Sequence, residues 1–327
     1  MAILNAGVVT TISPPTKTVQ LLADKLSMFV VGDKKTPKDW SYPGVWYTLD
    51  DSFGFQIENH YARKNIGYLR AMQAGAALIY DTDDDNFPNH AWSLRQRDCE
   101  AAMAQGQSWC NVYKMFHACH VWPRGFSLAH VTSPTPELQY PTKVSSPIQQ
   151  GLADGEPDVD AIWRLVTHQA WRDNFKFSKP LSVMLSPGTW CPFNSQTTWW
   201  WPEAYPLMYL PVYVPFRMTD IWRSFVAQRC LWEMGHGVVF HSPSEVWQDR
   251  NPHNLMHDFK DEVPGYLNNE AIVKVLTGVT LERGSKPAVV ISNLVACYAA
   301  LIGAKLIPAD EERPLRVWIE QVTALLT

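Results

Sequence analysis

Residues 76–85 read AALIYDTDDD and carry the clearest indication of the fold. The first half of this segment is a short apolar run that follows Gly75, which is typical of a buried strand. Its second half places four carboxylates within the five positions Asp81 to Asp85. Adjacent carboxylates at the end of a buried strand are costly unless positive charge compensates them. The stretch therefore predicts a ligand site at a strand end, with a solvated acidic turn as the alternative.

The residues before this stretch alternate between apolar runs and helical periods. Strands are expected at residues 8–12, 28–31, 47–49 and 76–80, and helices at residues 18–26 and 62–74. This order is typical of a mostly parallel central α/β sheet flanked by helices. In such sheets ligands bind beyond the carboxyl ends of the strands, where Asp33 and the acidic cluster fall.

The second half of the chain is less regular until its end. One helix is expected to start near residue 158 and another to cover 220–234, and the sequence pattern changes again near residue 268. Three further helices are predicted at 269–281, 287–307 and 315–326. We therefore expect a main domain at 1–267 and a C-terminal helical appendage at 268–327, which could form a homo-oligomer interface.

Composition excludes several classes of protein. The chain has 327 residues, 46% of them hydrophobic and 18% charged, with a formal net charge of −4. This balance does not fit a nucleic-acid-binding surface. The six cysteines form no CxxC pair, which argues against a structural zinc site and for reduced thiols. No basic segment precedes an apolar one at the N-terminus, and the apolar segment 288–307 is broken by polar residues. We expect no transmembrane segment and a cytoplasmic protein.

The acidic cluster has the chemistry of a divalent metal site. Carboxylate oxygens suit Mg²⁺ or Mn²⁺, and such ions commonly also take phosphate oxygens of a substrate. We expect Asp83, Asp84 and Asp85 to bind the metal and Asp81 and Asp83 to face the cofactor. A metal there would neutralise a diphosphate leaving group.

Several motifs, in order, resemble the STELLO family of plant glycosyltransferases. Besides the acidic cluster they are VGDKKTPKDW at 31–40, RKNIGYL at 63–69, VWPRG at 121–125, QGLADGEPDVD at 150–160, PFNS at 192–195 and QRCLWE at 228–233. The likeness covers roughly residues 8 to 260, and a run of co-linear motifs is more specific than any single one.

The resemblance implies a GT-A type nucleotide-sugar-binding fold. It implies a donor sugar linked to a nucleoside diphosphate, expected to be UDP, and a glycan or other hydroxyl acceptor. It also implies nucleotide contacts from Asn194, in the PFNS motif, and from Asp33, for which a polar turn is the equal alternative. Asp249 falls where related enzymes supply a late metal ligand. Members of the family are Golgi membrane proteins, so a Golgi-associated location is the alternative to the cytoplasm.

A more distant likeness is to the reversibly glycosylated polypeptides, which are plant UDP-arabinopyranose mutases. It is carried by KNIG at 64–67, by Asp83 to Asp85 and by RGFSL at 124–128. The resemblance implies that Arg124 is the arginine linked to reversible glycosylation, and it makes a pyranose–furanose mutase the second hypothesis. A second arginine of that family has no counterpart here. The third hypothesis is a catalytically silent partner that keeps the fold for assembly.

The remaining candidates each have a structural alternative. Arg63 and Lys64 are expected to contact the diphosphate, unless they form a solvated helix terminus. Arg124 is expected at the site, with a structural ion pair as the alternative. Asp220 is either the base that takes the acceptor proton or the N-cap of a helix. Trp199 and Trp201 either line an acceptor site or pack in the core.

Overall fold

The N-terminal third of the chain forms a parallel α/β unit. The computed structural model describes residues 3–41, 45–106, 108–172, 174–248 and 254–326. The unit contains β1 (Asn5–Thr11), α1 (Lys17–Ala23), β2 (Ser27–Gly32), β3 (Val45–Tyr47), the 3-10 turn η1 (Tyr61–Arg63), α2 (Lys64–Gln73) and β4 (Leu78–Thr82). The predicted order of strands and helices is confirmed.

The central sheet is large and mixed. Its strand order is β3-β2-β1-β4-β11-β8-β12-β10-β6-β7, and the added strands are β6 (Asp98–Ala104), β7 (Leu138–Ser145), β8 (Ile148–Gln150), β10 (Leu181–Leu185), β11 (Thr197–Trp200) and β12 (Val239–Ser242). The strands β3, β2, β1 and β4 are parallel, whereas β11 runs antiparallel to both β4 and β8. The predicted α/β sheet flanked by helices is confirmed, but β11 interrupts the run of parallel strands. Beyond β11 the sheet is mixed, with parallel pairs β8–β12 and β6–β10 and antiparallel pairs β10–β12 and β6–β7.

Both faces of the parallel unit are buried, which explains its continuous apolar strands. In β1, Val8 faces the large core that includes Ile66 of α2, while Val9 faces a second core with Leu22 of α1. This alternation follows from the two-residue period of a strand. Trp199 belongs to the second core, with its ring 4.2 Å from that of Tyr80, so it packs in the interior and does not line an acceptor site.

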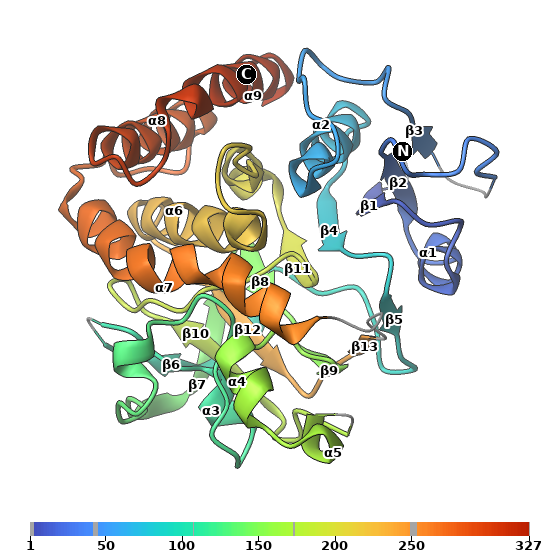
Figure 1. Cartoon of the computed structure of the whole chain (residues 1–327). Coiled ribbons are helices and arrows are strands. Elements are labelled where there is room, and N and C mark those ends of the chain that lie inside the picture. The colour runs from blue at the N-terminus through green and yellow to red at the C-terminus, as the bar shows by residue number, and fades with distance from the viewer. Residues whose placement is uncertain (1–2, 42–44, 107, 173, 249–253, 327) are drawn as a thin grey trace.

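Four long helices cover the face of the sheet on which α2 lies. They are α6 (Thr219–Glu233), α7 (Leu255–Gly278), α8 (Pro287–Gly303) and α9 (Glu312–Leu326), and α8 and α9 lie beside α6 and α2 (Figure 1). The boundary predicted between 267 and 268 falls inside α7. Trp318 of α9 is fully buried and donates its indole N–H to the Pro206 carbonyl oxygen at 2.9 Å. The C-terminal helices therefore share the main core instead of forming a separate appendage.

A small second sheet extends the end of β4. Its strands are β5 (Asn86–Pro88), β9 (Ala153–Gly155) and β13 (Val246–Gln248), and Asn86 pairs with Gln248. The other short elements include α3 (Tyr113–Phe116), α4 (Ala161–Val166), α5 (Gln169–Arg172), η3 (Pro202–Met208) and η4 (Phe216–Met218). No helix in the described ranges combines the length and the apolarity that a bilayer crossing requires.

Candidate functional site

A cleft of about 530 Å³ lies where β1, β2 and β4 end. Four of the predicted site residues line it, namely Asp33, Asp83, Asp84 and Asp85. The rest of its wall comes from the end of β1 and the residues after it, from Lys35, from the turn at 59–61, from η4 and from the end of β13. The sequence thus correctly located a hollow at the carboxyl edge of the parallel strands, which is where such sheets bind ligands.

Asp33 closes one end of this cleft by holding a turn in place. Its carboxylate accepts backbone N–H groups from Lys34 at 2.7 Å, Asn59 at 2.8 Å and His60 at 3.1 Å. Asn59 has a positive φ of 50°, a conformation that asparagine tolerates better than most residues. Asp33 is therefore a structural turn residue that also lines the cleft.

Asp81 lies inside β4 and not beyond its end. It pairs in register with Val8 and Thr198, and its side chain is fully buried. Its carboxylate lies 2.8 Å from the Lys64 ammonium and 3.0 Å from the Arg223 guanidinium. Two cations of the chain therefore supply the positive charge that the acidic cluster requires at this position, and Asp81 does not line the cleft.

Lys64 also reaches the next carboxylate of the cluster. Its ammonium lies 3.0 Å from Asp83 Oδ1, which in addition accepts the Tyr61 hydroxyl at 2.7 Å. Burial alone would lower the pKa of Lys64, but Asp81 and Asp83 outweigh burial and raise the pKa. Lys64 is thus a charged, fully buried residue that fixes one oxygen of Asp83. The predicted direct contact of Lys64 with a diphosphate is not consistent with this burial.

The last two acids of the cluster have separate partners. Asp84 accepts a hydrogen bond from the Thr11 hydroxyl, and burial raises the pKa of its carboxyl group while that bond opposes the shift. Asp85 accepts the Gln248 amide at 3.2 Å. Within the described ranges, no three His, Cys, Asp or Glu side chains converge closely enough to hold a metal by themselves. Asp249, the fourth predicted metal ligand, lies outside the described residues.

Arg63 has a structural role. Its guanidinium is buried and donates to the carbonyl oxygens of Gly32, Ile57 and Thr48 at 2.7, 2.8 and 3.0 Å. These bonds join the end of β2 to the loop before α2. The expected contact of Arg63 with a diphosphate is not consistent with this placement, because the side chain is buried, three of its N–H groups bond backbone oxygens and it does not line the cleft.

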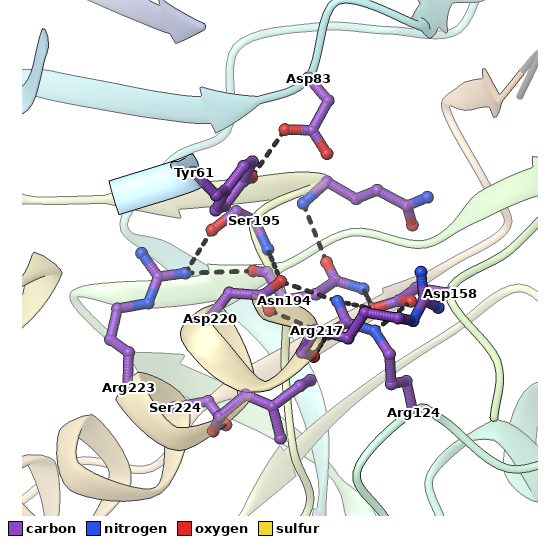
Figure 2. Close-up of polar contacts among 12 residues, drawn as sticks. Tyr61, Asp83, Arg124, Asp158, Asn194, Ser195, Arg217, Asp220, Arg223 and Ser224 are labelled. Atoms are coloured by element: carbon purple, nitrogen blue, oxygen red, sulfur yellow. Dashed lines mark hydrogen bonds and ion pairs between the residues drawn. The ribbon is translucent and has the colours of Figure 1, made fainter. Parts of the chain in front are cut away.

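Arg124 forms the buried ion pair that was its structural alternative (Figure 2). Its Nε and Nη2 donate to Asp158 at 2.8 and 2.9 Å, and its Nη1 and Nη2 donate to Asp220 at 3.0 and 2.9 Å. A fifth bond goes to the Arg217 carbonyl oxygen. All five guanidinium N–H groups are therefore engaged. Burial would lower the pKa of Arg124, but the two carboxylates outweigh it and raise the pKa.

Asp220 fits neither of its predicted roles. It lies in the first turn of α6, whose N-cap is Met218, and it makes no cap bond. Besides Arg124, its carboxylate accepts the backbone N–H of Ser195 at 3.3 Å. Because it is 6% exposed, paired with a cation and absent from the cleft wall, Asp220 is not placed to take a proton from an acceptor.

Asn194 connects these ion pairs into one network. Its amide donates to Asp158 at 2.9 Å and accepts the Gln150 amide at 3.0 Å. The next residue, Ser195, accepts a bond of 2.7 Å from Arg223. The network runs from Arg124 through the 194–195 turn to Arg223, as Figure 2 shows. From Arg223 it continues through Asp81 and Lys64 to Asp83. Asn194 is buried in this network and is not among the residues that line the cleft.

The cleft also contains residues that sequence reasoning missed. Phe216 is 56% exposed on the cleft wall and meets the rings of His60 and Tyr61 edge-on, at 5.7 and 6.4 Å. Gln248, the last residue of β13, also lines the cleft. It lies 163 positions along the chain from Asp85, to which it donates a hydrogen bond. His60 and Tyr61 precede the RKNIGYL motif, with one residue, Ala62, between Tyr61 and the motif. Their proximity to the motif was the available sequence signal.

Comparison with known proteins places these residues in a wider context. The family described as STELLO glycosyltransferases matches residues 217–326. Among curated proteins, "Probable glycosyltransferase STELLO1" of Arabidopsis thaliana is 30% identical over 286 residues, which is 79% of this chain and 36% of the relative. "Probable glycosyltransferase STELLO2" of the same plant is 30% identical over 277 residues, with shares of 76% and 36%. The chain thus spans about a third of the length of these relatives, and the resemblance noted in the sequence is confirmed.

Proposed function

Because the chain is related to the STELLO glycosyltransferases, we propose that it is itself a metal-dependent glycosyltransferase. In this proposal it transfers a sugar from a nucleoside diphosphate donor, UDP-linked, to a hydroxyl acceptor. The observation that carries the proposal is the cleft at the ends of β1, β2 and β4, with three consecutive carboxylates after β4. Four acids on one wall would repel a diphosphate unless a cation lies between them.

The oxygen-rich wall of the cleft suits a hard divalent ion. Asp83, Asp84 and Asp85 would hold Mn²⁺ or Mg²⁺. Ions of this kind usually keep several waters and bind through one or two carboxylates plus substrate phosphates, so a preformed cage of three acids is not required. When bound, the metal would neutralise charge on the leaving diphosphate.

The residues behind the cleft support this role by fixing Asp83. Lys64 and Tyr61 both bond its Oδ1, while the Asp83 side chain remains 27% exposed. One face of the carboxylate is therefore held by the protein as its other face meets the cleft. Phe216 supplies an exposed aromatic surface on the same wall.

The mutase hypothesis is the weaker of the two enzyme hypotheses. Glycosylation of Arg124 would require its bonds to Asp158 and Asp220 to break, and Arg124 is not on the cleft wall. No observation favours it over transfer to an acceptor. The silent-partner hypothesis predicts that neither nucleotide nor metal binds.

The proposal is tested by calorimetric titration of UDP into the protein with and without Mn²⁺. We expect binding that requires Mn²⁺ and that is lost in Asp83→Asn and Asp84→Asn. Asp310→Asn is the matched control, because Asp310 is exposed on η5 (Ala309–Glu311), outside the cleft wall. If UDP binds equally well with and without Mn²⁺, the proposed metal dependence is refuted. Absence of UDP binding would refute this donor, and GDP, CMP and dTDP would then decide between another nucleotide and a silent protein.

A further inference from the structure

His60 lies on the cleft wall, where hydrogen bonds and a ring contact fix both its backbone and its side chain. It is the N-cap of η1, which continues directly into α2. Its ring Nδ1 accepts the backbone N–H of Ala62 at 3.0 Å, while its own backbone N–H donates to Asp33 at 3.1 Å. The ring also meets Phe216 at 5.7 Å, with the two planes 80° apart. The backbone and the ring of His60 are therefore both held.

The contact with Ala62 determines where the imidazole proton lies. A backbone N–H can only donate, so Nδ1 must present a lone pair. A neutral imidazole with a lone pair on Nδ1 carries its proton on Nε2. The charged imidazolium would direct an N–H of its own at the Ala62 N–H and lose the cap. The geometry thus selects one form of the ring, neutral with Nε2–H.

The surrounding charges do not reverse this selection. Burial lowers the pKa of His60, and nearby Asp33 opposes that effect without overcoming it. The other charged groups on the same wall are Lys35 after β2, Asp83 to Asp85 after β4 and Arg217 of η4. Arg217 is held by Glu262 at 2.8 Å and by Asp258 at 3.4 Å. His60 is consequently neutral at pH 7.

We propose that His60 is a ligand-binding residue whose Nε2–H donates a hydrogen bond to an oxygen of the nucleotide bound in the cleft. The inference rests on the proposed function, because it takes a nucleotide as the occupant. A neutral donor is suited to this wall. A lysine or arginine would pair with the carboxylates, as Lys64 does with Asp81 and Asp83, and would be drawn away from the ligand. A neutral N–H avoids such pairing and costs no reorganisation when the ligand arrives.

The tautomer is tested first, by nitrogen-15 NMR of the histidine rings in the intact protein. We expect His60 to show a protonated Nε2 and an unprotonated Nδ1 at pH 7. His117 and His168 are internal references, because their Nδ1 atoms accept the backbone N–H groups of Cys119 and Ala170 in the same way outside the cleft. Addition of UDP with Mg²⁺ should shift the Nε2 signal of His60 and leave those two unchanged. A proton on Nδ1 of His60 at pH 7 would overturn the inference.

The contact is tested with His60→Asn. Asparagine is a favoured N-cap residue, so its side-chain oxygen can accept the Ala62 N–H while the distal donor is lost. We expect the Kd for UDP with Mg²⁺ to rise by about three- to tenfold, the range for one neutral hydrogen bond. His168→Asn makes the same change at an exposed turn and should leave the Kd unchanged.

The choice of ligand identifies the oxygen that is contacted. Weaker binding of UDP but not of uridine points to a phosphate oxygen, and weaker binding of both points to the nucleoside. An unchanged Kd for UDP in the folded His60→Asn variant would overturn the inference. If the wild-type protein binds no UDP, the proposed donor fails separately. The nucleotide among GDP, CMP and dTDP that the wild-type protein does bind is then titrated with Mg²⁺ into wild type and His60→Asn. Equal Kd values, or binding of none of these nucleotides, would overturn the role of the histidine.

Discussion

Replacement of Arg124 by methionine should destabilise the protein strongly without any direct effect on the cleft. Methionine keeps much of the aliphatic length and removes all five N–H donors. Asp158 and Asp220 would then be left 3% and 6% exposed without the cation that bonds both of them. Breaking a buried pair by removing one partner costs about 3–5 kcal/mol. Because two carboxylates lose their shared partner here, we expect the free energy of unfolding to fall by about 5 kcal/mol, at the upper end of this range.

The pH dependence of this loss has a definite sign. Without Arg124, burial should raise the pKa of both carboxyl groups above the ordinary aspartate value of about 3.9. A carboxyl group whose folded pKa is raised destabilises the protein above its unfolded pKa. The difference in the free energy of unfolding between wild type and Arg124→Met should therefore be largest near pH 7 and shrink as the pH falls toward about 4.

The assay is urea unfolding followed by tryptophan fluorescence at several pH values. The triple variant Arg124→Met, Asp158→Asn, Asp220→Asn is the control, because it also removes the two carboxylate charges that Arg124 balances and should recover at least about 1 kcal/mol over Arg124→Met alone. A loss below about 1 kcal/mol at pH 7, or one that grows on acidification, would refute the buried ion pair. Mass spectrometry after incubation with UDP-sugars should find Arg124 unmodified, and a glycosylated Arg124 in folded protein would contradict its placement.

Three further changes probe other parts of the structure. Burial, and then the nearby charge of Glu262, raise the pKa of Asp160 to about 7, so wild-type stability should fall by about 2 kcal/mol from pH 5 to pH 8. Asp160→Asn, which keeps an oxygen for the Ile162 N–H, should flatten that fall in urea titrations. Because α9 is part of the main core, Trp318→Ala should lower the free energy of unfolding by about 3–5 kcal/mol. For the same reason, removal of residues 268–327 should abolish folding, as judged by circular dichroism. A soluble, folded fragment of residues 1–267 would instead show that residues 268–327 form a separate appendage. Trp199→Leu should lower the urea midpoint without changing the KM for any acceptor, whereas a KM effect in folded protein would place Trp199 at the acceptor site.

Local sequence patterns were sufficient for the strands of the N-terminal parallel unit and for the location of the cleft. The apolar runs at 28–31 and 76–80 correspond to β2 and β4 because strands buried on both faces need apolar side chains at every position. The carboxylates after β4 then had to meet the residues after β2, since parallel strands end at one edge. Asp33 and Asp83 could therefore be assigned to one hollow without coordinates.

Local patterns misplaced the boundary in α7. Pro264 and Gly265 both disfavour a helix interior, yet α7 runs through them from Leu255 to Gly278. A Cβ at residue 265 would come 2.4 Å from the sulfur of Met218, so glycine lets α7 approach η4 closely. The intrinsic preference against the helix is outweighed by tertiary packing, which the sequence pattern does not contain.

The partners of the charged residues were decided only by the tertiary structure. For each of Lys64, Arg124 and Asp220 the sequence left a functional and a structural role open. The structural alternatives were a solvated helix terminus for Lys64, an ion pair for Arg124 and a helix N-cap for Asp220. Arg124 and Asp220 stand 96 positions apart, and Lys64 meets Asp81 only because α2 packs on the sheet beside β4. Burial and pairing depend on which distant segments converge. A cation that faces a ligand and one that neutralises a buried carboxylate therefore look alike until the chain is folded.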